Sequence, residues 1–136
     1  MKIIVCLDDN NGMLFNKRRQ SKDREIIRDL IELVGENTLR INEFSTNLFE
    51  ESEILPIKSN DFLEIAGEND FCMVENCHVR PCLSNISEII VYKWNRKYPT
   101  DFIFDVNPEA EGFSLKETRN FTGYSHEKIT REIYKK

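Results

Sequence analysis

The chain opens with Met1-Lys-Ile-Ile-Val-Cys-Leu-Asp-Asp-Asn-Asn-Gly-Met-Leu-Phe-Asn16, and this stretch decides the fold class. Residues 3–7 form a short, nearly continuous apolar run, which is typical of a strand covered on both faces in an α/β sheet. Turn-forming residues follow from Asp8 to Gly12. Because open α/β sheets bind ligands at the carboxyl ends of their strands, we expect a site at this loop.

The length and composition of the chain indicate one globular domain over residues 1–136. No apolar stretch approaches the length of a membrane span, and the run after Lys2 is too short for a signal peptide and lacks a small-residue cleavage site. We therefore expect a reduced, cytoplasmic setting and no membrane partner. The net charge of -5 argues against a general nucleic-acid binder.

A helix is predicted after the first loop, capped by Ser21 or Asp23. Gly35 is placed to end it. Its apolar residues recur at helical spacing: Ile26, Ile27, Leu30, Ile31, Leu33 and Val34. Residues 39–41 predict a second strand, after which Ser45 or Thr46 is expected to cap a short helical turn.

The second half of the chain predicts a series of strands, at residues 71–74, 88–94 and 101–104. We expect Trp94 to be partly exposed at a strand end, as an interface candidate. Residues 128–136 fit two patterns, because Ile129 and Ile133 lie at helical i,i+4 spacing and also belong to an apolar alternation.

In this order the features resemble the dihydrofolate reductase family. The first strand leads into a loop with Asp9, Gly12 and Asn16, and an acidic residue, Glu25 or Asp23, begins the next helix. Residues 88–94, 101–104 and 112–134, together with Thr46 after the second strand, resemble later parts of that fold. The resemblance implies a mixed α/β sheet with flanking helices and antiparallel C-terminal strands. It favours a strand over a helix for residues 128–136.

Two segments depart from the family pattern. Arg18-Arg19-Gln20 replaces a Leu-Pro-Trp segment, and Val74-Glu75-Asn76-Cys77 replaces a Gly-Gly pair that lets the backbone approach the cofactor pyrophosphate. A carboxylate at Glu75 would repel that pyrophosphate. The sequence therefore predicts a binding domain for a small polar or phosphorylated ligand rather than a nicotinamide-dependent reductase, and it does not identify a cofactor.

The candidate ligand-binding residues border the first loop and the end of the strand at residues 71–74. They are Asp9, Asn16, Arg18, Arg19, Thr46, Glu75 and Asn76. Glu25 would handle protons in any catalysis. The basic cluster around these positions, Lys17, Arg18, Arg19, Lys22 and Arg24, fits two interpretations: a solvated loop, which the pattern favours, or recognition of phosphate or a nucleotide.

Two other functions stay open: a hydrolase that acts on a phosphoester through a divalent ion near Asp8 and Asp9, and a partner-binding protein without a small ligand. The opening is also similar to small clostridial-type proteins labelled ribonuclease Z, but His78 and His126 alone cannot build the dinuclear zinc site which that label implies. The sequence leaves open whether Cys72, Cys77, His78 and Cys82 bind a metal or simply pack as structural side chains.

Overall fold

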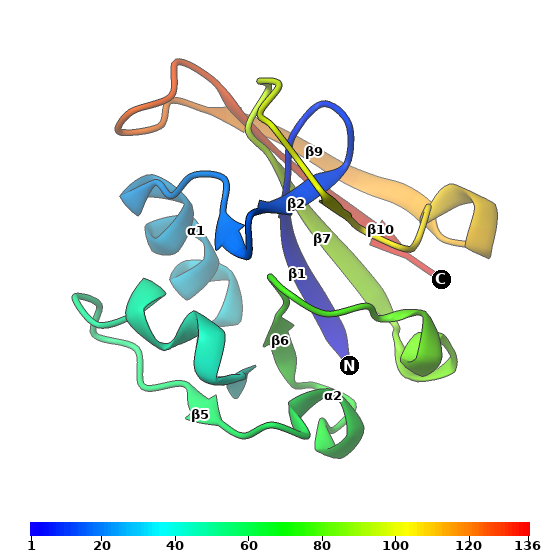
Figure 1. Ribbon diagram of the computed structural model, residues 1–136. Helices are drawn as coiled ribbons and strands as arrows, with labels where there is room; N and C mark the ends of the chain where they lie inside the picture. The colour runs from blue at the N-terminus through cyan, green and yellow to red at the C-terminus, as the bar shows by residue number, and fades with distance from the viewer.

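The computed structural model describes residues 1–136, and its centre is a seven-stranded mixed sheet. The strand order is β5-β4-β6-β1-β7-β10-β9 (Figure 1). Five neighbouring strands are parallel to one another: β5, β4, β6, β1 and β7. Strand β10 runs antiparallel to both of its neighbours, β7 and β9. The strands are β1 (Lys2–Leu7), β4 (Leu39–Ile41), β5 (Ile57–Lys58), β6 (Phe71–Met73), β7 (Glu88–Lys93), β9 (Ser114–Phe121) and β10 (Ile129–Lys135).

A smaller three-stranded sheet has the order β3-β2-β8. Its strands are β2 (Gly12–Phe15), β3 (Arg18–Arg19) and β8 (Phe102–Ile103). The helices are α1 (Arg24–Val34), α2 (Phe62–Ile65) and three short 3-10 helices, η1 (Glu43–Leu48), η2 (Arg80–Asn85) and η3 (Glu109–Glu111). None of these helices has the length and apolar character that crossing a bilayer requires.

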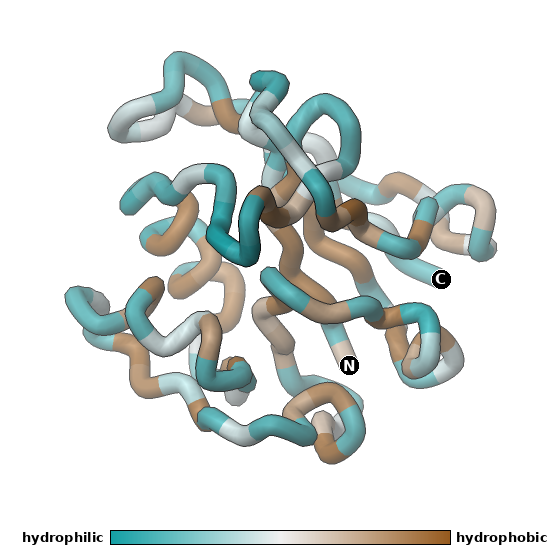
Figure 2. The backbone as a smooth tube through the Cα atoms, in the orientation of Figure 1, coloured by the Kyte–Doolittle hydropathy of each residue, from teal (hydrophilic) through white to brown (hydrophobic).

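Strand β1 lies in the middle of the large sheet and is covered on both faces, as its apolar run predicts. Ile3 and Val5 belong to one hydrophobic cluster, whereas Ile4, between them, belongs to the other. The alternation follows from the two-residue period of a strand, which sends successive side chains to opposite faces. Figure 2 shows the resulting apolar centre, with polar segments around the outside.

Helix α1 covers one face of the sheet, and its ends follow the sequence signals. Asp23 is the N-cap, and its side chain accepts a hydrogen bond from the backbone N–H of Glu25. Gly35 ends the helix with a φ of 58°, where a residue with a Cβ would be strained. The side chains of Ile26, Leu30 and Val34 are buried against the sheet.

The C-terminal segment is a strand, as the resemblance favours. Its residues pair with β7 on one side and with β9 on the other, with a register shift between Ile133 and Tyr134. The side chains of Ile129 and Ile133 are buried in the same cluster as those of α1. Residues four positions apart lie on one face of a strand as well as on one face of a helix, so their spacing fits both. The sheet therefore has the antiparallel C-terminal end that the resemblance implies.

Two local predictions are wrong. Ser45 and Thr46 lie inside η1, which is capped at Asn42, because the turn begins earlier than the hydroxyl residues suggest. Trp94 is buried, at 3% exposure, since its indole packs against the ring of His126 at a centroid distance of 4.6 Å. Trp94 therefore belongs to the hydrophobic core, although it directly follows the end of β7.

The cysteine-rich segment does not converge on one centre. Cys72 is buried in the core, while the imidazole of His78 stacks on Phe102 with ring centroids 4.6 Å apart. All four cysteines are free thiols, and burial raises the pKa of Cys77 to about 11 and that of Cys72 to about 12. No group of three or more His, Cys, Asp or Glu side chains has the arrangement of a metal site.

Candidate functional site

A small cavity lies at the carboxyl ends of β1 and β6, under the N-terminus of α1. Its volume is about 20 Å³, room for about one water molecule. The side chains around it come from β1, β2, the segment before α1, α1 itself, η1 and the ends of β6 and β7. They include Cys6, Met13, Arg19, Ser21, Asp23, Ile27, Leu48, Met73, Glu75 and Trp94. The centre of the candidate site is therefore nearly filled by the protein's own side chains.

An ion pair between Arg19 and Glu75 helps to fill this centre. The Arg19 guanidinium donates to both carboxylate oxygens of Glu75, from Nε at 2.7 Å and from Nη2 at 2.9 Å. Ser45 Oγ donates to the same carboxylate at 2.6 Å, and Arg19 also donates to Asn47 Oδ1 at 3.0 Å. Hydrogen bonding to Glu75 raises the pKa of Arg19 above its ordinary value, so this charge is fixed in place.

A tight hairpin brings Arg19 to this position. Asn16 and Lys17, which connect β2 to β3, have φ values of 50° and 61°. Two consecutive positive φ angles define the two-residue turn that suits the twist of paired strands, and Asn is among the residues that tolerate them. The turn pairs Leu14 with Arg19 and Phe15 with Arg18, so the two arginines leave the hairpin on opposite faces.

An open hollow of about 490 Å³ lies beside this hairpin. Arg18 is exposed there and forms no ion pair with the protein. No acidic residue lines the hollow, and of its two arginines only Arg18 is unpaired, since Arg19 is bonded to Glu75. The lining consists of Phe15, Asn16, Arg18, Arg19, Gln20, Tyr98 and Pro99. A hollow with this lining favours an anion.

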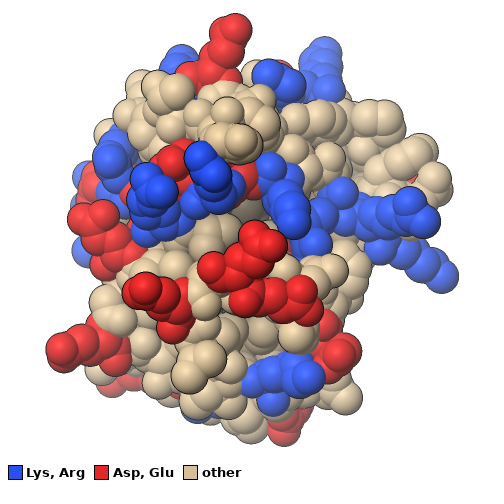
Figure 3. All heavy atoms as spheres, turned by 90° about the vertical axis from the view of Figure 1, so that its left-hand side faces the viewer, with Lys and Arg blue, Asp and Glu red and all other residues tan.

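A second open hollow, of about 680 Å³, lies between α1 and the segment after η1. Its lining carries both signs of charge. Lys22, Arg24 and Arg28 provide the basic groups, and Glu51 and Glu53 provide carboxylates. Figure 3 shows this face of the molecule, with basic side chains gathered above acidic ones. The mixed charge makes this hollow a less selective place for an anion than the hollow beside the hairpin.

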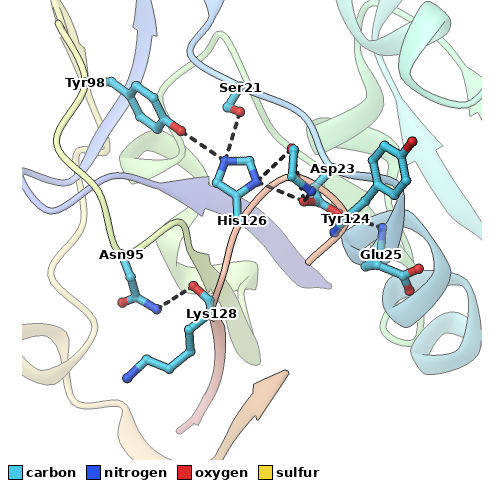
Figure 4. Close-up of polar contacts among 9 residues, drawn as sticks. Ser21, Asp23, Glu25, Asn95, Tyr98, Tyr124, His126 and Lys128 are labelled. Carbon is cyan, nitrogen blue, oxygen red and sulfur yellow. Dashed lines mark hydrogen bonds and ion pairs between the residues drawn. The ribbon is translucent and has the colours of Figure 1, made fainter. Parts of the chain in front are cut away.

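The imidazole of His126 lies at the centre of a polar network next to the cavity (Figure 4). Its Nδ1 is 2.8 Å from Asp23 Oδ2, and both side chains are almost completely buried, with 2% and 0% exposure. Its Nε2 is 3.1 Å from Ser21 Oγ and 3.0 Å from the hydroxyl of Tyr98. The network joins the β9–β10 connection, the start of α1 and the segment after β7.

Asp23 is held as a carboxylate by hydrogen bonds from the backbone. The N–H groups of Glu25, Tyr124 and Ser125 donate to it at 2.8–3.0 Å, in addition to the His126 contact. Burial on its own would raise the pKa of Asp23, but these hydrogen bonds outweigh burial and lower that pKa from 3.8 to about 2. An ionised Asp23 favours the proton of the imidazole on Nδ1.

The acidic loop after β1 has a structural part and an exposed part. Asp8 is buried and accepts four hydrogen bonds, from the backbone of Asn10, Gly12 and Tyr98 and from the Gln20 amide. The side chain of Asp9 is exposed. The two neighbouring carboxylates therefore do not face one common point.

The structure brings only some of the predicted residues together. Arg19 and Glu75 form the central ion pair, and Asn16 and Arg18 line the hollow beside the hairpin. Thr46 Oγ1 is buried without a hydrogen-bond partner, while Asn76 Oδ1 accepts from the amide of Asn42 at 2.8 Å. Asp9 and Glu25 do not line the cavity or either hollow, and Glu25 pairs with Arg28 on α1 at 3.2 Å.

Sequence reasoning missed Ser21, Tyr98 and His126 as parts of one network. In the sequence, Ser21 stands out only as a helix-cap candidate, and His126 is one of two isolated histidines. The contacts that join these residues span 105 and 28 positions of the chain. One local signal points to this network: Asp23 stands directly before a predicted helix. An N-cap carboxylate can also accept hydrogen bonds from other chain segments that lie beside the helix N-terminus.

Comparison with known proteins bears on the fold. No protein-family model matches the chain, and no curated protein matches its sequence. Among solved structures, it is similar to dihydrofolate reductase from Enterococcus faecalis, which was determined in a complex with NADP(H) and RAB-propyl. The TM-score is 0.67, the sequence identity is 10%, and the match covers 98% of this chain and 94% of that one. The protein therefore has a dihydrofolate-reductase-like fold.

Proposed function

We propose that the protein is a binding domain for a small phosphorylated ligand, which lies in the hollow beside the β2–β3 hairpin. The observation that carries the proposal is the exposed guanidinium of Arg18, which forms no ion pair in a hollow without acidic residues. Its planar fork matches the oxygens of a phosphate group, and two parallel hydrogen bonds give such a contact direction as well as strength.

The neighbours of Arg18 support this ligand class. Phe15 is 41% exposed in the same hollow and offers a flat apolar surface for a ring attached to the phosphate. Asn16 supplies an amide that can donate or accept hydrogen bonds. Arg19 is fully engaged with Glu75 and Asn47, so Arg18 is the arginine left free to bind the ligand.

The end of β6 argues against a nicotinamide-dependent reductase. Glu75 and Asn76 stand where the resemblance expects a glycine pair, and both side chains are already bonded within the protein. To admit a pyrophosphate here, the fold would have to displace the Arg19–Glu75 ion pair and bring like charges together. These residues do not fit the nicotinamide cofactor, and we assign no step to it.

The metal-dependent hydrolase receives no specific support. Asp8 is turned inward and uses its carboxylate oxygens for hydrogen bonds to the loop and to Gln20. Asp8 is therefore not free to share a cation with Asp9. We therefore retain the phosphate-binding proposal alone, with a protein that binds only a partner as an outcome of the test.

Isothermal titration with inorganic phosphate, AMP and NADPH tests the proposal. We expect AMP to bind more tightly than phosphate, and the Arg18→Gln variant to weaken AMP binding at least tenfold. The matched control is Lys116→Gln, which removes one positive charge from the exposed edge strand β9 and should leave AMP binding within twofold.

Three results would overturn the proposal. Tight NADPH binding that does not depend on Arg18 would restore the reductase. An equal loss of AMP binding in Arg18→Gln and Lys116→Gln would mean that net charge alone attracts the anion. No heat change with any of the three compounds would favour a protein that binds a macromolecular partner.

A further inference from the structure

The geometry around His126 points to a second property of this protein: we propose that Ser21, His126 and Asp23 form a nucleophilic triad that transfers acyl groups from esters. Ser21 Oγ lies 3.1 Å from His126 Nε2, and the opposite ring nitrogen lies 2.8 Å from Asp23 Oδ2. A hydroxyl, an imidazole and a carboxylate connected in this order can activate the hydroxyl as a nucleophile, whatever fold carries them. This inference does not depend on the phosphate ligand, since Ser21 does not line the hollow beside the hairpin.

Asp23 and Trp94 fix the imidazole in the orientation that the triad needs. With Nδ1–H donated to the Asp23 carboxylate, Nε2 is left with the lone pair that faces Ser21. The indole of Trp94 packs on one side of the ring, with an angle of 30° between the two planes. Asp23 is itself held by three backbone N–H groups, so it cannot turn away to follow another partner. It acts as a positioning residue.

Ser21 lies next to residues that line an open hollow and next to backbone hydrogen-bond donors. It is half-buried and lines the cavity together with Lys22 and Asp23, which also line the larger hollow next to α1. The backbone N–H groups of Lys22 and Asp23 donate to no acceptor inside the protein. Such groups beside a nucleophile can stabilise the negative oxygen that develops during attack.

Tyr98 competes with Ser21 for the same nitrogen. Its hydroxyl lies 3.0 Å from Nε2, and a neutral imidazole offers one lone pair there. Whenever the phenol donates to Nε2, the Ser21 hydroxyl loses its base. The arrangement thus contains an activated serine and a group that restrains it, which makes the effect of removing Tyr98 a sharp test.

The proposed step is ordinary acyl transfer. Ser21 Oγ forms a bond to the ester carbonyl carbon while its proton moves to His126 Nε2. The ester C–O bond then breaks, and the leaving alkoxide takes that proton and departs as an alcohol. Water repeats the sequence on the acylated serine, so that a carboxylic acid is released and Ser21 regains its proton. No oxidant, reductant or metal is required.

A fluorophosphonate probe tests the nucleophile directly, because attack by a serine oxygen on phosphorus expels fluoride and leaves a covalent adduct. We expect labelling of the full chain to map to Ser21 by mass spectrometry and to disappear in Ser21→Ala. Ser114→Ala, which removes an exposed hydroxyl on β9, is the matched control and should be labelled like the wild type. An adduct at any other residue, or no adduct at all, would overturn the proposal.

Two further variants separate a triad from a structural cluster. Tyr98→Phe should raise the labelling rate at least threefold, and Asp23→Asn should lower it at least tenfold in protein whose circular dichroism is unchanged. If Asp23→Asn fails to fold, Tyr98→Phe still decides the point, since a cluster that only holds the chain together predicts no faster labelling. A Tyr98→Phe rate equal to or below that of the wild type would contradict the competition and with it the triad.

Discussion

Helix α1 carries two buried carboxylates with different surroundings, Asp23 at its N-cap and Asp29 in its second turn. Asp29 accepts from the hydroxyl of Tyr92 at 2.6 Å and from Arg131 at 2.9 Å, and it also pairs with Arg119. Asp23 instead accepts from three backbone N–H groups and from His126, whose far nitrogen faces two hydroxyls.

The difference lies in where each chain of contacts ends. The partners of Asp29 are two arginines, which balance its charge, and the hydroxyl of Tyr92; these contacts join α1 to β7, β9 and β10. Burial and then the hydrogen bond to Asp29 raise the pKa of Tyr92 far above its ordinary value, so this phenol stays protonated. The contacts of Asp23 lead through His126 to Ser21, which lines a cavity. Burial of a carboxylate therefore does not by itself identify a functional site. A carboxylate whose hydrogen bonds lead to a side chain that lines a cavity is the better candidate.

The largest expected effect is a loss of stability when the contacts of Asp29 are broken. Asp29→Asn should lower the free energy of unfolding by about 3–5 kcal/mol, because it removes the buried carboxylate that pairs with both Arg119 and Arg131 and leaves the buried Arg131 with only the half-exposed Glu117 as a counter-charge. Tyr92→Phe is the matched control and should cost about 1–2 kcal/mol, since it removes one hydrogen bond. Urea unfolding measures both, and a loss below 1 kcal/mol for Asp29→Asn would show that the cluster is not a structural one.

Asp23→Asn should have a smaller effect on stability and a larger one on reactivity. The amide keeps one acceptor for the helix cap but places a donor near the backbone N–H groups and His126, at a cost of about 2–3 kcal/mol. Fluorophosphonate labelling of the folded variant is expected to fall at least tenfold. An unchanged labelling rate would mean that Asp23, like Asp29, has only a structural role.

The pH dependence of Asp23 gives a finer contrast. Its pKa is lowered from 3.8 to about 2, so the stability it contributes is fully present above pH 4 and is lost as the pH falls through 2. The difference in unfolding free energy between wild type and Asp23→Asn should therefore shrink between pH 4 and pH 2. NMR titration of the Asp23 side-chain carboxyl measures the pKa directly, and a midpoint near 3.8 would mean that the backbone hydrogen bonds are not made in solution.

The smallest stability effect is expected at the hairpin. Arg18→Gln should change the free energy of unfolding by less than about 0.5 kcal/mol, because Arg18 is an exposed side chain without partners in the protein. Thermal unfolding with and without AMP should then show a smaller ligand-induced shift than for the wild type. A strong destabilisation of Arg18→Gln without ligand would mean that Arg18 stabilises the hairpin instead of serving to bind an anion.

The sequence was a good guide wherever neighbouring residues determine structure. The run from Ile3 to Leu7 predicts a strand covered on both faces, and Gly35 predicts the end of α1. These signals are local, because the period of the apolar residues and the backbone freedom of glycine act within a few positions. The ambiguity at residues 128–136 has the same origin, since i,i+4 spacing also places two residues on one face of a strand.

The site was less predictable because its contacts join distant parts of the chain. Arg19 and Glu75 could both be named as departures from a family pattern, but not as partners of each other, which lie 56 positions apart. His126 carries no motif, and its role depends on the β9–β10 connection that folds back over α1. The burial of Trp94 has the same cause, because its neighbour in space is the imidazole rather than solvent.

The protonation state of His126 tests the account most directly. A long-range ¹H–¹⁵N NMR spectrum at pH 8 has only two imidazoles to distinguish, His78 and His126. We predict that His126 carries its proton on Nδ1, bonded to Asp23, and that Nε2 is unprotonated and accepts a hydrogen bond from a hydroxyl. A His126 imidazole with its proton on Nε2 would contradict this prediction.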